Sequence, residues 1–163
     1  MELELAVDNQ SGNSVALAKV CSIHKGMAVA CCCAAMATLA PVALVQLHIM
    51  KDLPDPPGRL FNSKRVVTSK GAYHLGIPDG VLGLASYGVT LALLLAATPE
   101  RPIVRRLLRG KLAWDATMAI RNVRKQVTEH KRICSWCIGA AVATAGLVYF
   151  ARKVRDTEPL RPA

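Results

Sequence analysis

The feature that most constrains this chain is a long apolar block without charges near its N-terminus. Gly26 to Met50 contains no Lys, Arg, Asp or Glu over 25 positions. An α-helix rises 1.5 Å per residue, so this block is longer than the roughly 30 Å thickness of a bilayer's hydrocarbon core. Two further blocks, 80–98 and 133–151, are each uncharged over 19 residues, close to the roughly 20 that a membrane helix needs. The lengths therefore support three membrane spans.

The alternative reading of these blocks is a soluble domain with buried helices. A helix at the surface of a soluble protein has one polar face, whereas residues 28–45 and 82–96 are apolar nearly all round. The apolar content of 52% is concentrated in the blocks rather than spread along the chain. We therefore predict an all-α integral membrane protein, whose helices have lipid as a partner.

The positive charge of the chain gathers at the ends of the apolar blocks. A formal net charge of +10 could also indicate nucleic-acid binding. Clusters that flank membrane spans are instead typical of cytoplasmic segments that face an anionic leaflet. We therefore expect no nucleic acid as a partner. The flanking residues are Lys19 and Lys25 before the first block, Arg101, Arg105, Arg106, Arg109 and Lys111 after the second, and Arg152, Lys153 and Arg155 after the third.

Changes in composition divide the chain into three parts. We predict a polar N-terminal tail over 1–18, a membrane domain over 19–155 and a C-terminal tail over 156–163. The N-terminal segment is acidic and lacks the basic start of a cleaved secretory signal, so we expect the first span to remain as an anchor. A polar loop over 51–73 follows that span, and the second span begins after Pro78, which suits a first helical turn.

Residues 100–132 combine an apolar stripe at helical spacing with many basic side chains. Each basic residue would cost about 2.5–3.5 kcal/mol near the centre of a membrane helix. Taken alone, such an amphipathic helix lies on the membrane surface or in water. The number of crossings, three or four, depends on whether this helix crosses or packs its stripe inward. The stripe consists of Leu112, Ala116, Ala119, Ile120, Val123 and Val127.

The motif Cys134-Ser-Trp-Cys137 is the strongest chemical signal in the chain. Two cysteines three apart at the start of a helix face the same side, within reach of a disulfide. Backbone amides at that end favour a thiolate at Cys134, which can exchange with a disulfide or pass electrons to an acceptor. The alternative is a pair of reduced cysteines that only pack. A structural zinc site would need four ligands, and His130 is the only nearby third candidate, so we predict no metal site.

Two stretches of the chain resemble the vitamin K epoxide reductase family. They are residues 66–87, which include Gly76-Ile-Pro78, and Ile133-Cys-Ser-Trp-Cys137. The resemblance covers most of residues 26–151. It implies a membrane bundle of four helices around a quinone, in which the third helix, at about 110–132, is basic and amphipathic in this chain.

The resemblance also implies roles for particular residues. Cys134 and Cys137 would be the catalytic redox pair, with Cys137 nearer the quinone. Ser69 matches the family serine after the extracytoplasmic loop, and Asp79 stands where animal members have a quinone-contacting Asn, so both would bind the quinone. The implied protein is a multi-pass quinone-linked thiol–disulfide oxidoreductase of a bacterial inner membrane or an endomembrane. It would pass electrons from a thioredoxin-like thiol partner to ubiquinone, menaquinone or a similar quinone.

One departure from the family pattern leaves the function open. Members usually carry two loop cysteines that relay electrons, whereas 51–73 has no cysteine and Ser63 stands where the second would be. A thiol partner would then have to reach Cys134 directly. One alternative is a non-catalytic scaffold or interaction protein on the same fold. Another is a membrane-surface binding module that uses the basic helix of 101–132.

Overall fold

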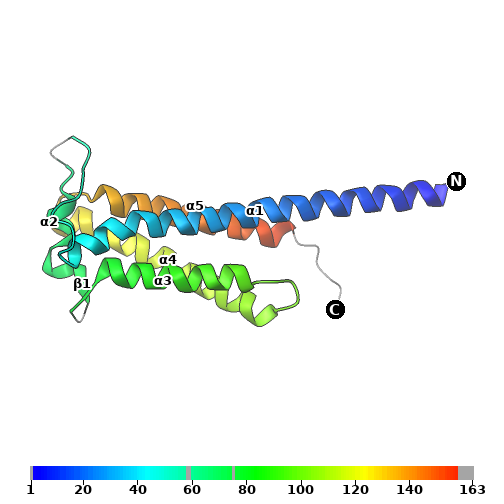
Figure 1. The fold of residues 1–163 in the computed structure, drawn as a ribbon. Coiled ribbons are helices and arrows are strands. Elements are labelled where there is room, and N and C mark those ends of the chain that lie inside the picture. The colour runs from blue at the N-terminus through cyan, green and yellow to red at the C-terminus, as the bar shows by residue number, and fades with distance from the viewer. Residues whose placement is uncertain (1, 58–59, 75, 158–163) are drawn as a thin grey trace.

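The computed structural model describes residues 2–57, 60–74 and 76–157, and these residues are mostly helical (Figure 1). The expected all-α class is therefore confirmed. The hairpin of β1 and β2, two residues per strand, is the only sheet in this part of the chain. The elements are α1 (Glu2–Gln46), α2 (Ser63–Val67), a 3-10 turn (Lys70–Ala72), β1 (Tyr73–His74), β2 (Ile77–Pro78), α3 (Asp79–Ala96), α4 (Pro102–Lys125), a π-helical turn (Gln126–His130) and α5 (Ser135–Thr157).

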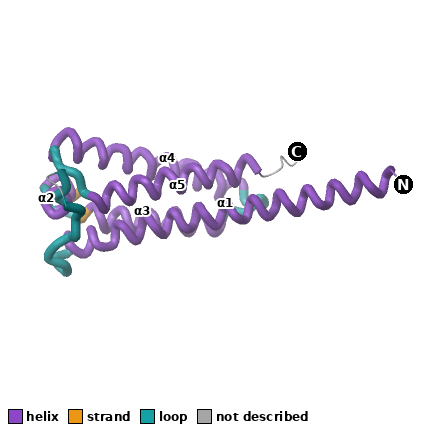
Figure 2. The backbone as a smooth tube through the Cα atoms, turned by 90° about the horizontal axis from the view of Figure 1, so that it is seen from above, coloured by secondary structure: helices purple, strands orange, loops and turns teal. Residues whose placement is uncertain are grey.

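The long helices α1, α3, α4 and α5 run lengthwise beside one another, in alternating directions (Figures 1 and 2). Helix α1 packs most extensively against α5 and then against α3, while α4 packs against both α5 and α3. The segment from 47 to 78, with α2 and the hairpin, covers one end of the helices, which we call the loop end. The opposite end holds the α3–α4 connection and the C-terminal turns of α5, and we call it the basic end.

Three helices are long and apolar enough to cross a membrane, judged by length and composition. They cover Ala16–Gln46, Asp79–Ala96 and Ser135–Asp156, and they correspond to the three blocks expected from the sequence. Helix α4 is not among them. The number of crossings therefore stays a prediction.

Helix α1 begins earlier than the predicted first span of 26–50. The predicted polar tail over 1–18 is helical from Glu2 onward and continuous with the first span, and its division from the membrane domain stays a prediction. The segment before the apolar block contains no proline, so nothing in it forces the helix to stop. The N-terminal part of α1 extends beyond the other helices (Figures 1 and 2). At the other terminus α5 reaches Thr157, so the predicted tail begins inside this helix, and its residues 158–163 lie outside the described part of the chain.

Helix α1 also ends earlier than predicted, at Gln46. His48 adopts a left-handed conformation with φ of 61°. The N–H of His48 donates to the carbonyl of Val45 at 3.0 Å, and the N–H of Ile49 donates to Leu44 at 2.9 Å. This is the hydrogen-bond pattern of a Schellman motif, which closes a helix C-terminus. Residues 47–50 therefore belong to the loop end rather than to the span.

Small residues allow the helices to approach α1 closely. A Cβ added at Gly80 of α3 would lie 2.8 Å from the backbone nitrogen of Ala43. A Cβ added at Gly146 of α5 would lie 3.0 Å from the sulfur of Cys31. Close backbone approach through small residues is how membrane helices gain van der Waals contact. Cys32 is fully buried in the same core.

Helix α4 packs through a face that only partly coincides with the predicted apolar stripe. Leu112 is buried, whereas Ile120 and Val127 are 69% and 57% exposed. The other three residues of the stripe are half-buried, so the stripe packs inward only in part. Asp115, one turn from Leu112, is only 3% exposed. The reason is that α4 turns this carboxylate toward polar groups on α3.

Those groups form a hydrogen-bonded cluster around Asp115 between α3 and α4. Its carboxylate accepts a hydrogen bond from Ser86 Oγ at 2.9 Å and another from Thr90 Oγ1 at 2.6 Å. Lys111 forms an ion pair with the same carboxylate and also donates to Ser86 Oγ at 2.8 Å. One basic residue of α4 is thereby paired inside the helix packing.

Candidate functional site

The two cysteines of the motif lie at the start of α5, at the loop end. Cys134 directly precedes the helix and is fully buried, and Cys137 lies in its first turn. The N–H of Cys137 donates to Cys134 Sγ at 3.3 Å, and the two thiols are also hydrogen-bonded to each other. Both are free thiols in this structure. The structure thus brings the pair together as the spacing predicts.

The surroundings of Cys134 favour its thiolate. The hydrogen bond from the Cys137 thiol is the largest influence, and burial opposes it. A hydrogen bond with the Ser63 hydroxyl, whose single proton is shared with the Asp55 carboxylate, and the N–H groups of Trp136 and Cys137 act in the same direction. Together these donors lower the pKa of the Cys134 thiol to about 7. The expected effect of the helix N-terminus therefore has specific sources in the first turn of α5.

Gln126 is a site residue that the sequence analysis missed. It is buried in the π-helical turn after α4, and its Oε1 accepts the N–H of Cys134 at 2.8 Å. Its side chain also forms a hydrogen bond with the Cys137 thiol. Such π-turns are frequent at functional sites because they redirect one side chain out of helical register. No local sequence signal marks this residue.

Ser63 connects the loop end to the cysteine motif through Asp55. The N–H and Oγ of Ser63 donate to the Asp55 carboxylate at 2.6 and 2.5 Å. Ser135 Oγ donates to the same carboxylate at 2.9 Å, and Ser135 N–H donates to Ser63 Oγ at 3.2 Å. Burial tends to raise the pKa of Asp55, but these hydrogen bonds outweigh it and the pKa is lowered. One carboxylate therefore holds the loop against the start of α5.

Backbone contacts hold the same loop in place. Ile133 N–H donates to the carbonyl of Leu60 at 2.9 Å, and Asn62 N–H donates to the carbonyl of Ile133 at 3.2 Å. The indole of Trp136 donates to the carbonyl of Pro54 at 3.0 Å. The result is an apolar cover over Cys134, so a partner could reach this thiol only after the loop moves. The buried apolar residues that pack with Cys134 are Val42, Val45, Leu53, Val66 and Val67.

A cavity of about 70 Å³ lies beside Cys137. Ser69 and Asp79, the two residues that the resemblance assigns to the quinone, also line it. Ser69 precedes the 3-10 turn, and Asp79 is the first residue of α3. Three of the four predicted site residues thus share one cavity, while Cys134 is not among its lining residues. The rest of the lining comes from Leu39, Val42, Gln46, Val66, Val67, Gly71, Ala72, Gly80, Asn122, Lys125 and Gln126.

Gln46, at the end of α1, forms hydrogen bonds with several segments that line this cavity. Its Nε2 donates to the carbonyls of Val67 and Ala72 at 2.9 and 3.3 Å. Its Oε1 accepts the N–H of Gly80 at 2.9 Å. One buried amide thereby joins α1, the loop and the start of α3. The sequence analysis missed this residue because its partners are distant in the chain.

The donors around the cavity suit a quinone, but the cavity is small. Hydroxyl and amide groups can donate to the two carbonyl oxygens of a quinone, and a carboxyl group can do so only when it is protonated. Apolar side chains with a few polar groups are the usual lining of a ligand pocket. Typical ligand pockets have volumes of about 300–1,000 Å³. The chemistry of the lining therefore fits, whereas the lining side chains would have to move apart to admit the whole ring.

The fold and the site define a helical membrane protein that carries a dithiol beside a small cavity. Residues 26–151 match the family described as the vitamin K epoxide reductase family, so the chain belongs to that family and the resemblance is confirmed. Members are membrane-integral thiol–disulfide oxidoreductases that are linked to quinones in general. No curated protein matches the chain at a significant level.

Proposed function

We propose that this protein passes electrons from thiols through Cys134 and Cys137 to a membrane quinone. The observation that carries the proposal is the contact between the two thiols. The pKa of Cys134 is lowered, and Cys137 lines the cavity. Ser69 and Asp79, on the same cavity, are the proposed binding residues for ubiquinone, menaquinone or a similar quinone. Metal ligands have no role in this proposal.

The proposed reaction balances as two linked exchanges. In the first, Cys134 and Cys137 give up two electrons and two protons and become a disulfide. A quinone supplies the acceptor, since it takes up two electrons and two protons to become a quinol. In the second, a thioredoxin-like dithiol attacks this disulfide through a mixed disulfide and leaves oxidised, which restores both thiols.

Ser63 changes how thiols reach the pair. Its hydroxyl occupies the family position of a loop cysteine and is hydrogen-bonded to the Cys134 thiol. A hydroxyl cannot relay electrons, so the partner must act on the pair itself. Because Cys134 is fully buried, we propose that the loop around Asp55 opens during this exchange.

The test measures quinol and thiols together. Purified protein in detergent is reduced, freed of reductant and mixed with a short-chain ubiquinone or a menaquinone analogue. We expect one quinol for every two thiols lost, and a loss of at least about a hundredfold in rate for Cys134→Ala and Cys137→Ala. Cys33→Ala is the matched control, because Cys33 is an exposed free cysteine of α1. No quinone-dependent loss of thiols would exclude the proposal and leave the non-catalytic scaffold.

A second experiment tests the arrangement of the loop. In Ser63→Cys the introduced thiol would lie within contact of Cys134, so mild oxidation should cross-link the two positions. Thr68→Cys, at an exposed position just after α2, serves as the control and should not cross-link. Mass spectrometry of the digested protein identifies the linked peptides. If both variants cross-link equally, the loop is not held as described.

A further inference from the structure

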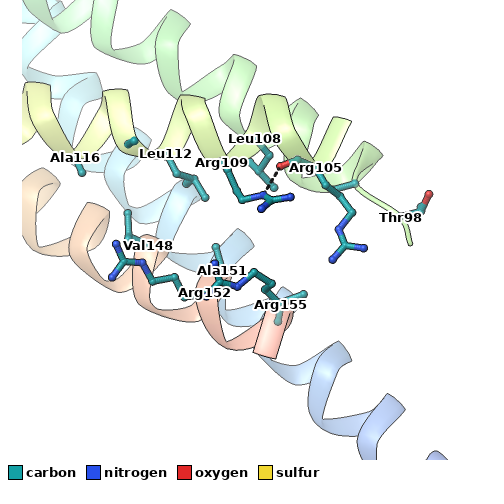
Figure 3. A pocket seen from close by; sticks show the side chains of 13 residues that line it. Thr98, Arg105, Leu108, Arg109, Leu112, Ala116, Val148, Ala151, Arg152 and Arg155 are labelled. Carbon is teal, nitrogen blue, oxygen red and sulfur yellow. Dashed lines mark hydrogen bonds between the residues drawn. The ribbon is translucent and has the colours of Figure 1, made fainter. Parts of the chain in front are cut away.

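A second cavity, of about 300 Å³, lies at the basic end between α4 and α5 (Figure 3). Four arginines line it, Arg105 and Arg109 from α4 and Arg152 and Arg155 from α5. No Asp or Glu is among its lining residues. Thr98, from the α3–α4 connection, adds a hydroxyl. The quinone proposal uses none of these residues.

Two of the four arginines, Arg109 and Arg152, bring positive charge that no carboxylate balances in the described part of the chain. Arg155 pairs at 3.2 Å with its exposed neighbour Asp156, which does not line the cavity. Arg109 Nε donates to the backbone carbonyl of Arg105 at 3.4 Å, a bond that leaves its charge uncompensated. Within the described part of the chain, neither Arg109 nor Arg152 forms an ion pair with a carboxylate. A guanidinium group suits a phosphate because its N–H groups can bind two oxygens at once.

The remaining wall of the cavity is apolar. It continues along facing sides of α4 and α5, as Figure 3 shows for Leu112, Ala116, Val148 and Ala151. One end of the cavity is lined by Ala97 and Thr98, which directly follow the last residue of α3. If α3 crosses a membrane, this end of the cavity would lie at the depth at which lipid head groups meet their acyl chains.

We propose that this cavity binds an anionic phospholipid. The phosphate would lie among the guanidinium groups, and the first part of an acyl chain would lie along the apolar wall. Basic pockets between membrane helices are known to hold anionic head groups on the side where positive charge gathers. The volume of about 300 Å³ lies at the lower limit for ligand pockets, which fits one phosphate and part of one chain.

The bound lipid would have a structural effect on α4. This helix is not apolar enough to count as a span, and Arg105 and Arg109 lie in its first turns. A phosphate between these residues and Arg152 would reduce their repulsion and hold α4 against α5. The inference does not depend on the redox proposal, since it concerns the opposite end of the helices.

The test compares two double variants of the full chain. Arg109→Gln with Arg152→Gln removes two charges from the cavity, and Arg101→Gln with Arg106→Gln removes two exposed charges at the same end. Delipidated protein in detergent is titrated with phosphatidylglycerol or phosphatidylcholine, and native mass spectrometry counts the bound lipids. We expect phosphatidylglycerol to bind preferentially and to weaken about ten- to thirtyfold in the cavity variant. The control should weaken by less than about threefold.

Other results would overturn the inference. Equal weakening in both variants would indicate diffuse attraction by surface charge, and equal binding of the two lipids would remove the phosphate specificity. Displacement of the lipid by millimolar inorganic phosphate would indicate a site for a free anion. If the glutamine variant fails to fold, Arg109→Lys with Arg152→Lys keeps the charge. It should still lose several-fold in affinity, because lysine cannot bind a phosphate with two N–H groups.

Discussion

Two carboxylates in this protein collect hydroxyl groups, yet they lie in different surroundings. Asp55 is half-buried in the loop and accepts hydrogen bonds from Ser63 and Ser135. Asp115 is buried between α3 and α4, and its partners include a cation, Lys111. No cation pairs with Asp55 among the described residues. Asp55 therefore holds the loop in place, whereas Asp115 allows a basic helix to pack.

The difference follows from the accessibility of water to each carboxylate. Close to water, the charge of Asp55 stays solvated in part, so water can replace its partners when the loop opens. Inside the helix packing, the charges of Asp115 and Lys111 depend on each other, because removal of either leaves a buried charge without compensation. We therefore expect the first cluster to control access to Cys134 and the second to control folding.

The largest loss of stability is expected from Asp115→Ala. The substitution leaves the Lys111 ammonium between α3 and α4 without its counter-charge, which should cost about 3–5 kcal/mol of unfolding free energy. Unfolding by SDS in mixed micelles, followed by circular dichroism, measures this loss. The double variant Lys111→Met with Asp115→Leu removes both charges and should lie within about 1 kcal/mol of wild type. If the single and double variants lose equal stability, packing rather than charge explains the cluster.

A smaller effect is expected from Asp55→Ala. The loss of one charged acceptor for Ser63 and Ser135 should cost about 2 kcal/mol, because water restores part of the bonding. Asp52→Ala is the control: this exposed carboxylate pairs with Lys64 and accepts the N–H of Leu53, and its loss should change stability by less than about 0.5 kcal/mol. Alkylation of Cys134 should accelerate by roughly tenfold as the loop opens more often. Slower or unchanged alkylation would contradict the role given to Asp55.

The fold could be predicted from the sequence where one physical rule dominates. Uncharged blocks specify membrane helices by length, and the three spans follow them. The end of α1 did not follow this rule, because a left-handed His48 closes the helix inside the apolar block. The buried face of α4 was missed although the i, i+4 spacing of Lys111 and Asp115 is a signal for an ion pair. The buried ion pair, and not the apolar stripe alone, determines which face of α4 packs inward.

The site could be predicted where the residues are adjacent or match the family pattern. The spacing of Cys134 and Cys137 predicts their contact, and the resemblance led to Ser69 and Asp79, which line the cavity with Cys137. Gln46 and Gln126 could not be predicted, since their roles arise only when distant segments pack together. The covered state of Cys134 is likewise a property of the packed loop. The contact between the two cysteines could therefore be predicted from the sequence, whereas the burial of Cys134 could not.

Ser63→Ala tests the contribution of one hydroxyl group to the Asp55 cluster. It removes the side-chain hydrogen bond to Asp55 and should cost about 1 kcal/mol of unfolding free energy, measured by the same SDS titration. It also removes a donor to Cys134, so the pKa of that thiol should rise. Ser86→Ala removes a hydroxyl that donates to Asp115 and accepts from Lys111, and it is the control for hydroxyl loss away from the cysteines. It should leave the reactivity of Cys134 unchanged.

The smallest change is expected in the pH profile of Cys134. With a pKa of about 7, half of this thiol is ionised at neutral pH, against roughly 3% for a thiol of pKa 8.5. The thiolate is the reactive form, so alkylation should rise with pH and reach half its maximum near pH 7. Ser63→Ala should move this midpoint upward, because the thiolate loses the hydrogen bond with Ser63. The shift separates the two roles of Ser63, because opening of the loop alone would raise the rate at every pH without moving the midpoint. An unmoved midpoint would therefore assign Ser63 to loop docking alone.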